Sequence, residues 1–178
     1  RPEVEIVAVG NELLTGDTLD TNSRFLTRAV ESLGLAPRFK HVAGDREEDI
    51  VLVLREPASR AGVVFVTGGL GPTEDDLTRK SVALAFGRRL IFHAELLEPI
   101  RIWFARAGLP MPPDNERQAL LPSGAKPLPN PAGTAPGFIL EEGRTSVIVL
   151  PGVPREMRGM YEASVHPYLA SRFRGGEV

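Results

Sequence analysis

The feature that most constrains the fold is an alternation of short β-rich runs with helical patterns along the first half of the chain. Strands are predicted over 4–9, 38–42 and 63–66, and the third is the most hydrophobic segment of the chain. Amphipathic patterns predict helices over 21–33 and 77–86, and a further helix between the second and third strands. Because strand–helix–strand units form right-handed crossovers, this order predicts an α/β fold with a mainly parallel sheet covered on both faces.

Several residues predict where the helices begin, bend and end. Asp20 is the expected N-cap of the first helix, and Gly34 is placed to end it. Asp45 has two interpretations, as the cap of the second helix or as a metal-binding carboxylate. Pro57 predicts a kink or a break in that second helix before Ala61, because proline lacks a backbone N–H and clashes with the preceding turn.

The segment at about 108–137 differs in composition, since it contains half of the 16 prolines. A connection of this length is uncommon in a compact domain, so we expect a functional lid or an inserted arm. Beyond it, 137–150 is typical of a β-hairpin, and a closing helix is predicted from Pro154 towards Phe173. The expected organisation is one domain over 1–178 with a proline-rich arm.

Composition excludes several classes of protein. The 21 lysines and arginines against 23 acidic residues give a formal charge of −2, which argues against a surface built for nucleic acid. No apolar run approaches about 18 residues, so no membrane-spanning helix is expected. Cysteine is absent, which excludes disulfides, thiol nucleophiles and cysteine-bound metals. The start has no apolar signal segment, so a cytoplasmic location is expected, and the missing initiator Met suggests an excised piece.

Glycines with nearby acidic residues follow four of the predicted strands. These turns are at 10–12, 44–45, 68–76 and 151–156. In open α/β sheets, ligands bind beyond the carboxyl ends of the strands, where the strand order reverses. One glycine turn after a strand is ordinary structure, but four turns with carboxylates predict a single site formed by several loops.

The loop 67–76 has the clearest binding signal. Gly68 and Gly69 lack a Cβ, so backbone N–H groups can approach an anion, and the helix that follows adds its positive N-terminal end. The loop matches neither a P-loop nor the G-x-G-x-x-G motif. Its three acidic residues would repel a bare pyrophosphate and so favour a bridging cation, whereas Asp75 and Asp76 could instead cap the helix.

Other candidates also have two interpretations each. Lys80 lies four residues after the last aspartate of the loop, where it would contact a phosphate or form an exposed ion pair. Gly133 and Thr134 would hold a phosphate or ribose, or belong to a rigid proline-rich loop. Pro154 opens a helix whose start would bind an anion or simply be well formed. The role of Asn22 stays open.

Several strings resemble those of a known family in the same order. The string TGGLGPT at 67–73, with two aspartates after it, is similar to the signature of MoaB/Mog-type molybdopterin-binding domains. The strings DTN at 20–22, NPAGTAPGF at 130–138 and LPGVPREM at 150–157 resemble the competence/damage-inducible CinA family. The likeness covers nearly the whole chain.

This resemblance implies a three-layer α/β/α sandwich with a mixed, mostly parallel sheet. It implies ADP-ribose pyrophosphatase activity, giving AMP and ribose 5-phosphate, with a divalent metal and potassium. Related domains bind molybdopterin, and some adenylylate it with Mg-ATP. By position, Asp76 resembles the active-site aspartate of the relatives and Asp45 resembles their second acidic residue. The C-terminal deamidase domain of full-length CinA proteins is expected to be absent.

The leading hypothesis is metal-assisted hydrolysis of a nucleotide diphosphate, with ADP-ribose as the favoured substrate. The alternatives are a molybdopterin or nucleotide binding module and molybdopterin adenylyl transfer. The expected partners are a nucleotide or pterin phosphate and further copies of the chain, without nucleic acid or membrane. The catalytic candidates are Asp76, Asp45 and Lys80, and the two aspartates would bind Mg²⁺ or a similar ion. The predicted ligand-binding residues are Gly10, Glu12, Asn22, Thr67, Gly68, Gly69, Gly71, Gly133, Thr134, Gly152, Val153 and Pro154.

Overall fold

The computed structural model describes residues 2–173, which contain a six-stranded sheet. The strand order is β2-β1-β3-β8-β7-β6, and every strand of this sheet except β7 points the same way. The strands are β1 (Glu3–Val9), β2 (Ala36–Ala43), β3 (Val63–Thr67), β6 (Lys126–Leu128), β7 (Gly137–Glu142) and β8 (Thr145–Leu150). This mixed, mostly parallel sheet confirms the predicted fold class.

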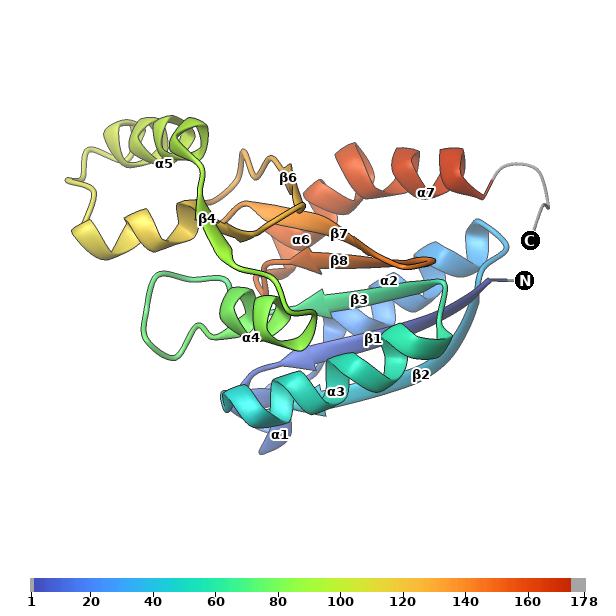
Figure 1. Cartoon of the computed structure of the whole chain (residues 1–178). Coiled ribbons are helices and arrows are strands. Elements are labelled where there is room, and N and C mark those ends of the chain that lie inside the picture. The colour runs from blue at the N-terminus through green and yellow to red at the C-terminus, as the bar shows by residue number, and fades with distance from the viewer. Residues whose placement is uncertain (1, 174–178) are drawn as a thin grey trace.

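Helices cover both faces of the sheet, which is the middle of three layers (Figure 1). Alternate residues of β1 point to opposite faces, so that Ile6 and Val7 belong to different core clusters. The cluster of Ile6 includes α2 (Thr21–Ser32), α6 (Pro154–Met160) and α7 (His166–Arg172), and the cluster of Val7 includes α3 (Glu47–Arg60) and α4 (Thr78–Ala85). The predicted α/β/α sandwich is therefore confirmed.

The strand order reverses at β1. The chain passes from β1 through α2 to β2 on one side, and then through α3 to β3 on the other side of β1. Such a reversal opens a crevice at the carboxyl ends of the two central strands. Figure 1 shows the loop after β3 and the short helix α1 (Asn11–Leu14) at this same end of the sheet.

Asp20 is confirmed as an N-cap, Asp45 is not one, and Pro57 does not split its helix. Asp20 caps α2, because its carboxylate accepts the N–H of Ser23 at 2.9 Å. The N-cap of α3 is Arg46 and not Asp45, whose side chain is bonded elsewhere. Pro57 does not break α3: it is buried in the final turns of the helix, where it removes only one backbone hydrogen bond.

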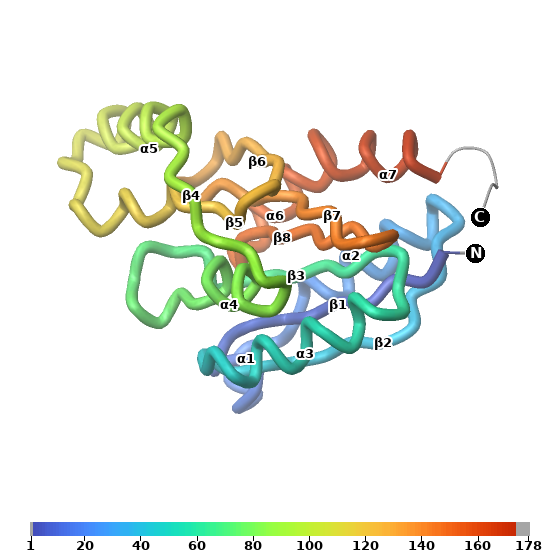
Figure 2. Tube along the Cα trace, in the orientation of Figure 1, coloured from blue at the N-terminus to red at the C-terminus, as the bar shows by residue number. Residues whose placement is uncertain are grey.

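The proline-rich segment is divided between two parts of the molecule. Its first half holds the 3₁₀-helix η1 (Pro113–Ala119) and β5 (Leu120–Pro122), which pairs with β4 (Leu90–Phe92). Figures 1 and 2 show η1 and α5 (Ala94–Arg106) projecting beyond the sheet. Its second half contains β6, the edge strand of the main sheet. The second half of the segment is therefore not a lid or an arm, since hydrogen bonds to β7 hold β6 in the sheet.

The end of the described chain agrees with the predicted hairpin and closing helix. The strands β7 and β8 pair antiparallel, and α6 continues through a π-helical turn (Tyr161–Val165) into α7. Tyr161 in this turn is buried and meets the ring of Phe25 edge-on at 5.5 Å. No helix within residues 2–173 is both long enough and apolar enough to cross a membrane.

Candidate functional site

A cavity of about 570 Å³ opens at the carboxyl ends of β1, β3 and β8. This volume lies within the range of small-molecule sites. All four glycine turns that were predicted to meet contribute to its wall. The predicted site residues that line it are Gly10, Glu12, Asn22, Asp45, Thr67, Gly68, Gly69, Gly71, Asp76, Thr134, Gly152, Val153 and Pro154.

Two glycines allow the loop after β3 to pass close to its neighbours. Gly68 has a φ of +96°, and a Cβ there would lie 2.2 Å from the backbone oxygen of Val9. Gly69 has a φ of +66°, and its Cβ would lie 2.2 Å from the hydroxyl oxygen of Thr78. Side chains are strained at such φ values and have no room here, so both positions require glycine.

Some backbone N–H groups of this loop donate within the protein, and others at the cavity have no acceptor in the described residues. The N–H of Gly68 donates to the last residue of β8 at 3.1 Å, and the N–H of Gly71 donates to Asp76 at 2.8 Å. The amides of Gly69 and Leu70 have no acceptor within residues 2–173, and both residues line the cavity. Anion-binding donors are therefore available at Gly69 and Leu70, whereas the amides of the predicted Gly68 and Gly71 are already bonded.

The carboxylate of Asp76 closes the loop on itself. It accepts the N–H of Gly71 at 2.8 Å, the N–H of Thr73 at 2.9 Å and the hydroxyl of Thr73 at 2.6 Å. These bonds use both carboxylate oxygens. The interpretation of Asp76 as a helix cap is wrong, because α4 begins after Leu77 without a side-chain cap. Asp76 therefore lies at the cavity wall and also shapes the loop.

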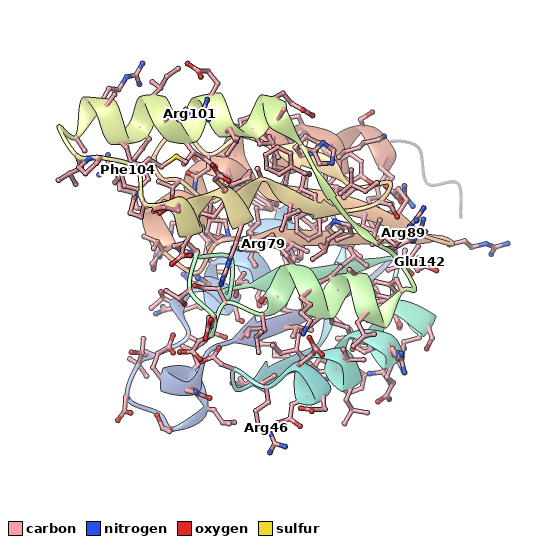
Figure 3. All side chains as sticks on the ribbon, turned by 60° about the vertical axis from the view of Figure 1, so that its left-hand side comes forward. Arg46, Arg79, Arg89, Arg101, Phe104 and Glu142 are labelled. Carbon is pink, nitrogen blue, oxygen red and sulfur yellow. The ribbon has the colours of Figure 1, made fainter. Side chains whose placement is uncertain are left out.

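Arg79 lies behind this loop, in the first turn of α4 (Figure 3). It is 5% exposed, and its guanidinium donates to the backbone oxygens of Leu70 at 2.5 Å and Gly71 at 2.6 Å. Burial lowers the pKa of Arg79 to about 10, so the group stays charged at neutral pH. The hydroxyl of Thr78 donates to the backbone oxygen of Gly68 at 2.7 Å. Arg79 and Thr78 thus hold the loop by donating hydrogen bonds to its backbone carbonyls. No sequence pattern indicated this role for Arg79.

Asp45 joins the turns after β1 and β2. Its carboxylate accepts the N–H of Asn11 at 3.1 Å, and its own N–H donates to the side-chain oxygen of Asn11 at 3.0 Å. This reciprocal pair explains why Asp45 does not cap α3. It also holds Asp45 at the cavity, although the pairing with Asn11 was not predicted.

Asn22 connects α2 to the turn after β8. Its side-chain N–H donates to the backbone oxygen of Gly152 at 2.8 Å. Its side-chain oxygen is buried and has no donor within residues 2–173. Asn22 therefore lines the cavity with an amide whose oxygen has an unfilled capacity to accept a hydrogen bond.

Glu156 lines the cavity although it was not among the predicted site residues. Its carboxylate accepts a hydrogen bond from Asn130 at 2.8 Å, and Asn130 also donates to the backbone oxygen of Ala135 at 2.9 Å. A Cβ on Gly133 would lie 2.3 Å from this carboxylate. Gly133 therefore makes room for Glu156 behind the wall and does not line the cavity. The only sequence signal for Glu156 was its place as the acidic residue of the glycine turn 151–156.

Lys80 lies away from the cavity. Its ammonium is 2.7 Å from the carboxylate of Glu47 on α3. The predicted pair with Asp76 does not form, because Asp76 precedes α4 and its carboxylate faces Gly71 and Thr73. Lys80 does not line the cavity, so its position does not support the expected contact with a phosphate there.

The charged side chains of the cavity wall are all acidic, namely Glu12, Asp20, Asp45, Asp75, Asp76 and Glu156. A phosphate bound here therefore needs a cation. No three His, Cys, Asp or Glu side chains within residues 2–173 are grouped to hold a metal ion. The donors fit an ion of the Mg²⁺ type, which commonly binds through one or two carboxylates together with ligand phosphates. They do not form a cage that would hold the ion alone.

The fold is that of an α/β domain with a cavity of small-molecule size at a strand-order reversal, and comparison with known proteins gives its class. The chain belongs to the family of probable molybdopterin binding domains, whose model matches residues 5–171.

Two relatives place the chain more narrowly. CinA from Thermoplasma acidophilum superposes with a TM-score of 0.86 and 33% identity, over 93% of this chain and 97% of that one. A CinA-like protein of Dictyoglomus thermophilum is 46% identical over 167 residues, which cover 94% of this chain and 41% of that protein. These matches confirm the resemblance to CinA. The chain spans about two fifths of the length of such curated relatives.

A more distant structure shows the same fold. The molybdopterin biosynthesis enzyme MoaB from Thermus thermophilus superposes with a TM-score of 0.65 and 23% identity, over 97% of this chain and 96% of that one.

Proposed function

We propose that the chain hydrolyses ADP-ribose to AMP and ribose 5-phosphate with the help of a divalent metal ion. The observation that carries this proposal is one cavity in which the free amides of Gly69 and Leu70 lie among six acidic side chains. Amide donors bind phosphate oxygens, and carboxylates bind the cation that a diphosphate brings. The pairing of these two donor types matches a metal-bound diphosphate.

The residues have separate tasks in this proposal. The amides of Gly69 and Leu70 stabilise negative charge on the phosphate oxygens. Asp45 would bind the metal, because its second carboxylate oxygen has no donor within residues 2–173, and Asp75 is the second candidate for the same reason. Asp76 would act by holding the loop. When bound, a divalent ion such as Mg²⁺ neutralises the diphosphate, and potassium would add further positive charge.

Hydrolysis consumes one water molecule. The water oxygen bonds to one phosphorus atom, the bond between that phosphorus and the bridging oxygen breaks, and the bridging oxygen leaves with the other phosphate. The water protons pass to the products and to solvent.

A product assay tests the proposal. The protein is incubated with ADP-ribose and Mg²⁺, Mn²⁺ or Co²⁺, with and without potassium, and AMP is measured by chromatography. We expect AMP that disappears on addition of EDTA. Asp45→Asn should lower the rate at least about tenfold while keeping the acceptor for Asn11. The matched change Asp49→Asn, on the exposed side of α3, should leave the rate unchanged. No AMP with any ion rejects the proposal.

A second candidate function is binding of molybdopterin or a nucleotide without turnover, or adenylyl transfer to molybdopterin. The family to which the chain belongs favours it, since its model describes a probable molybdopterin binding domain. Calorimetric titration with a pterin phosphate and with ADP-ribose, beside the product assay, distinguishes the functions. Saturable binding without AMP supports a binding module, and release of pyrophosphate from ATP with molybdopterin supports transfer.

We also propose that the chain self-associates. Four exposed apolar side chains lie on β4, on α5 and just after α5, and they could contact another copy: Ile91, Phe92, Ile102 and Leu109. Sedimentation velocity at several protein concentrations tests this. A monomer at every concentration would contradict self-association.

A further inference from the structure

A second hollow, of about 450 Å³, lies next to the main cavity between α2 and α6. Its lining residues are Thr21, Arg24, Phe25, Arg28, Ala29 and Arg158. Thr21 lines both this hollow and the main cavity, so the two are neighbours. The proposed hydrolysis assigns no role to this hollow.

The hollow is positively charged and its charge is not neutralised. No acidic residue lines it. Over the described range 2–173, Arg24, Arg28 and Arg158 make no ion pair. Glu31 and Glu162 follow within four residues of Arg28 and Arg158, yet neither comes within ion-pair distance. Three guanidinium groups are thus free to bind an anion.

The charges on α2 are unfavourable for the helix itself. Arg24 and Arg28 are four residues apart, so two like charges share one helix face. Arg24 lies in the N-terminal half of α2, whose first turn has no acidic residue, and positive charge near a helix N-terminus is destabilising. Residues that destabilise their own helix are expected at functional sites. A bound anion would reduce the repulsion between the two arginines and the unfavourable interaction of Arg24 with the helix N-terminus.

Aromatic side chains hold one of the three arginines in place. The guanidinium carbon of Arg158 lies 5.3 Å from the ring centroid of Phe25, and that ring packs edge-on against Tyr161. A guanidinium is a planar fork that binds two phosphate oxygens at once. Holding it against a ring reduces the freedom that is lost when the anion binds.

We propose that Arg24, Arg28 and Arg158 form a second anion site that binds a phosphate group beside the main cavity. The shared residue Thr21 favours a small ligand over a macromolecule, because a small ligand can reach both hollows. The phosphate is either an additional group on the nucleotide in the main cavity or a separate inorganic anion. In the first case the inference rests on the proposed function, and it then extends the substrate class to nucleotides with an extra phosphate.

The first experiment is a calorimetric titration with pyrophosphate in the presence of Mg²⁺. Wild type should bind two pyrophosphates per chain, and Arg24→Gln/Arg28→Gln should bind one. Arg101→Gln/Arg106→Gln removes the same charge from α5, no residue of which lines either hollow, and should still bind two. If the main cavity binds no diphosphate, wild type binds one and the α2 variant binds none, so the two proposals fail independently.

The second experiment distinguishes the sources of the phosphate by comparing ADP-ribose with 2′-phospho-ADP-ribose. If the nucleotide supplies the phosphate, the α2 double variant should bind the phosphorylated form about tenfold more weakly and ADP-ribose equally well. If the phosphate is separate, both nucleotides should bind the variant as they bind wild type, and pyrophosphate should still bind beside saturating ADP-ribose.

A variant on the other helix provides an independent measurement. Arg158→Gln should weaken the second pyrophosphate site about tenfold. Thermal melting should show that all variants fold, because the substituted side chains are exposed. The proposal is overturned if wild type binds no anion outside the main cavity. It is also overturned if Arg24→Gln/Arg28→Gln binds like wild type, or if the α5 pair causes the same loss.

Discussion

At the scale of single residues, the loop after β3 depends most on Gly68 and Asp76. Gly68 passes so close to β1 that no side-chain atom fits, and the nearest atom is a backbone oxygen that cannot rotate away. Asp76 accepts three hydrogen bonds from the loop that it follows. Both residues therefore help to fix where the backbone N–H groups of Gly69 and Leu70 lie.

The first prediction concerns Gly68→Ala. We expect a loss of about 1–2 kcal/mol from the left-handed backbone and about 1–3 kcal/mol more from the contact with Val9. The control is Gly34→Ala, where φ is +76° and nothing lies within 4 Å of the added carbon, so only the backbone cost applies. Urea unfolding measures both. Equal losses in the two variants would show that the contact with Val9 is not limiting.

The second prediction concerns Asp76→Asn. An amide cannot replace this carboxylate, because its NH₂ group would meet a backbone N–H donor of Gly71 or Thr73. We expect a loss of about 1–3 kcal/mol and weaker binding of ADP-ribose. Asp75→Asn, at a neighbouring residue without a side-chain hydrogen bond in the described range, should not change stability. A fully stable Asp76→Asn protein would argue against the loop-shaping role.

At the scale of elements, α4 and α3 anchor opposite ends of the parallel strands. The first turn of α4 holds the loop after β3 through Arg79. The last turn of α3 holds β1 through Arg60, whose guanidinium donates to the fully buried carboxylate of Glu5 at 2.5 and 3.0 Å. His41 on β2 lies 2.8 Å from the same carboxylate.

The third prediction concerns Arg79→Met. This change leaves the backbone oxygens of Leu70 and Gly71 without their donor, which should cost about 1–3 kcal/mol for each and loosen the loop. Arg88→Met removes a partly exposed ion pair with Glu142 and should cost at most about 1 kcal/mol. Hydrogen exchange of the loop amides measures the loosening. Unchanged exchange in Arg79→Met would contradict this role.

The fourth prediction concerns pH. Burial alone would raise the pKa of Glu5, but hydrogen bonds from Arg60 and His41 outweigh it and lower the pKa below its ordinary value. The unfolded chain therefore takes up the proton at higher pH than the folded chain. The stabilisation from Glu5 should be complete above the ordinary glutamate pKa of about 4.3 and be lost as pH falls through the lower folded value.

Urea unfolding from pH 7 to pH 3 tests this dependence in Glu5→Gln. The variant should be less stable at pH 7 and should lose less stability on acidification than wild type. Glu3→Gln, on the same strand but in an exposed pair with Arg38, should change stability by less than about 1 kcal/mol. Parallel pH profiles of wild type and Glu5→Gln would contradict the assignment.

At the scale of the whole molecule, charges of opposite sign are kept apart around the ligand site. The cavity wall carries carboxylates, Arg79 lies behind the loop, and the arginines of the second hollow lie beside the cavity. The acidic wall attracts a cation, whereas a phosphate is attracted only once a cation or the arginines are near it.

The fifth prediction follows from this arrangement. Mg²⁺ alone should raise the melting temperature by little, because no three acidic side chains of the described chain form a metal cage. Mg²⁺ with ADP-ribose should raise it by several degrees, since ligand binding to the folded state adds stability. Thermal melting with each component alone and together tests this. A full shift with Mg²⁺ alone would indicate a preformed metal site.

The accuracy of the sequence-based predictions follows from how local each signal is. The runs that became β1 and β3 were recognisable because strands buried on both faces are mostly apolar, with Glu5 as the charged exception within β1. The strand β6 was missed because it is short and contains Pro127, which an edge strand tolerates. Its pairing with β7 depends on a partner strand, and no pattern within β6 itself indicates that partner.

The sequence by itself determined the fold class, the positions of the glycine turns and the clustering of carboxylates at strand ends, because periodicity and turn chemistry are properties of neighbouring residues. Only the tertiary structure decided which partner each polar group takes. It directs Asp76 to Gly71 and Thr73, and Lys80 to Glu47. Donors and acceptors compete for one another only after distant segments have packed together, so spacing along the chain cannot specify the outcome.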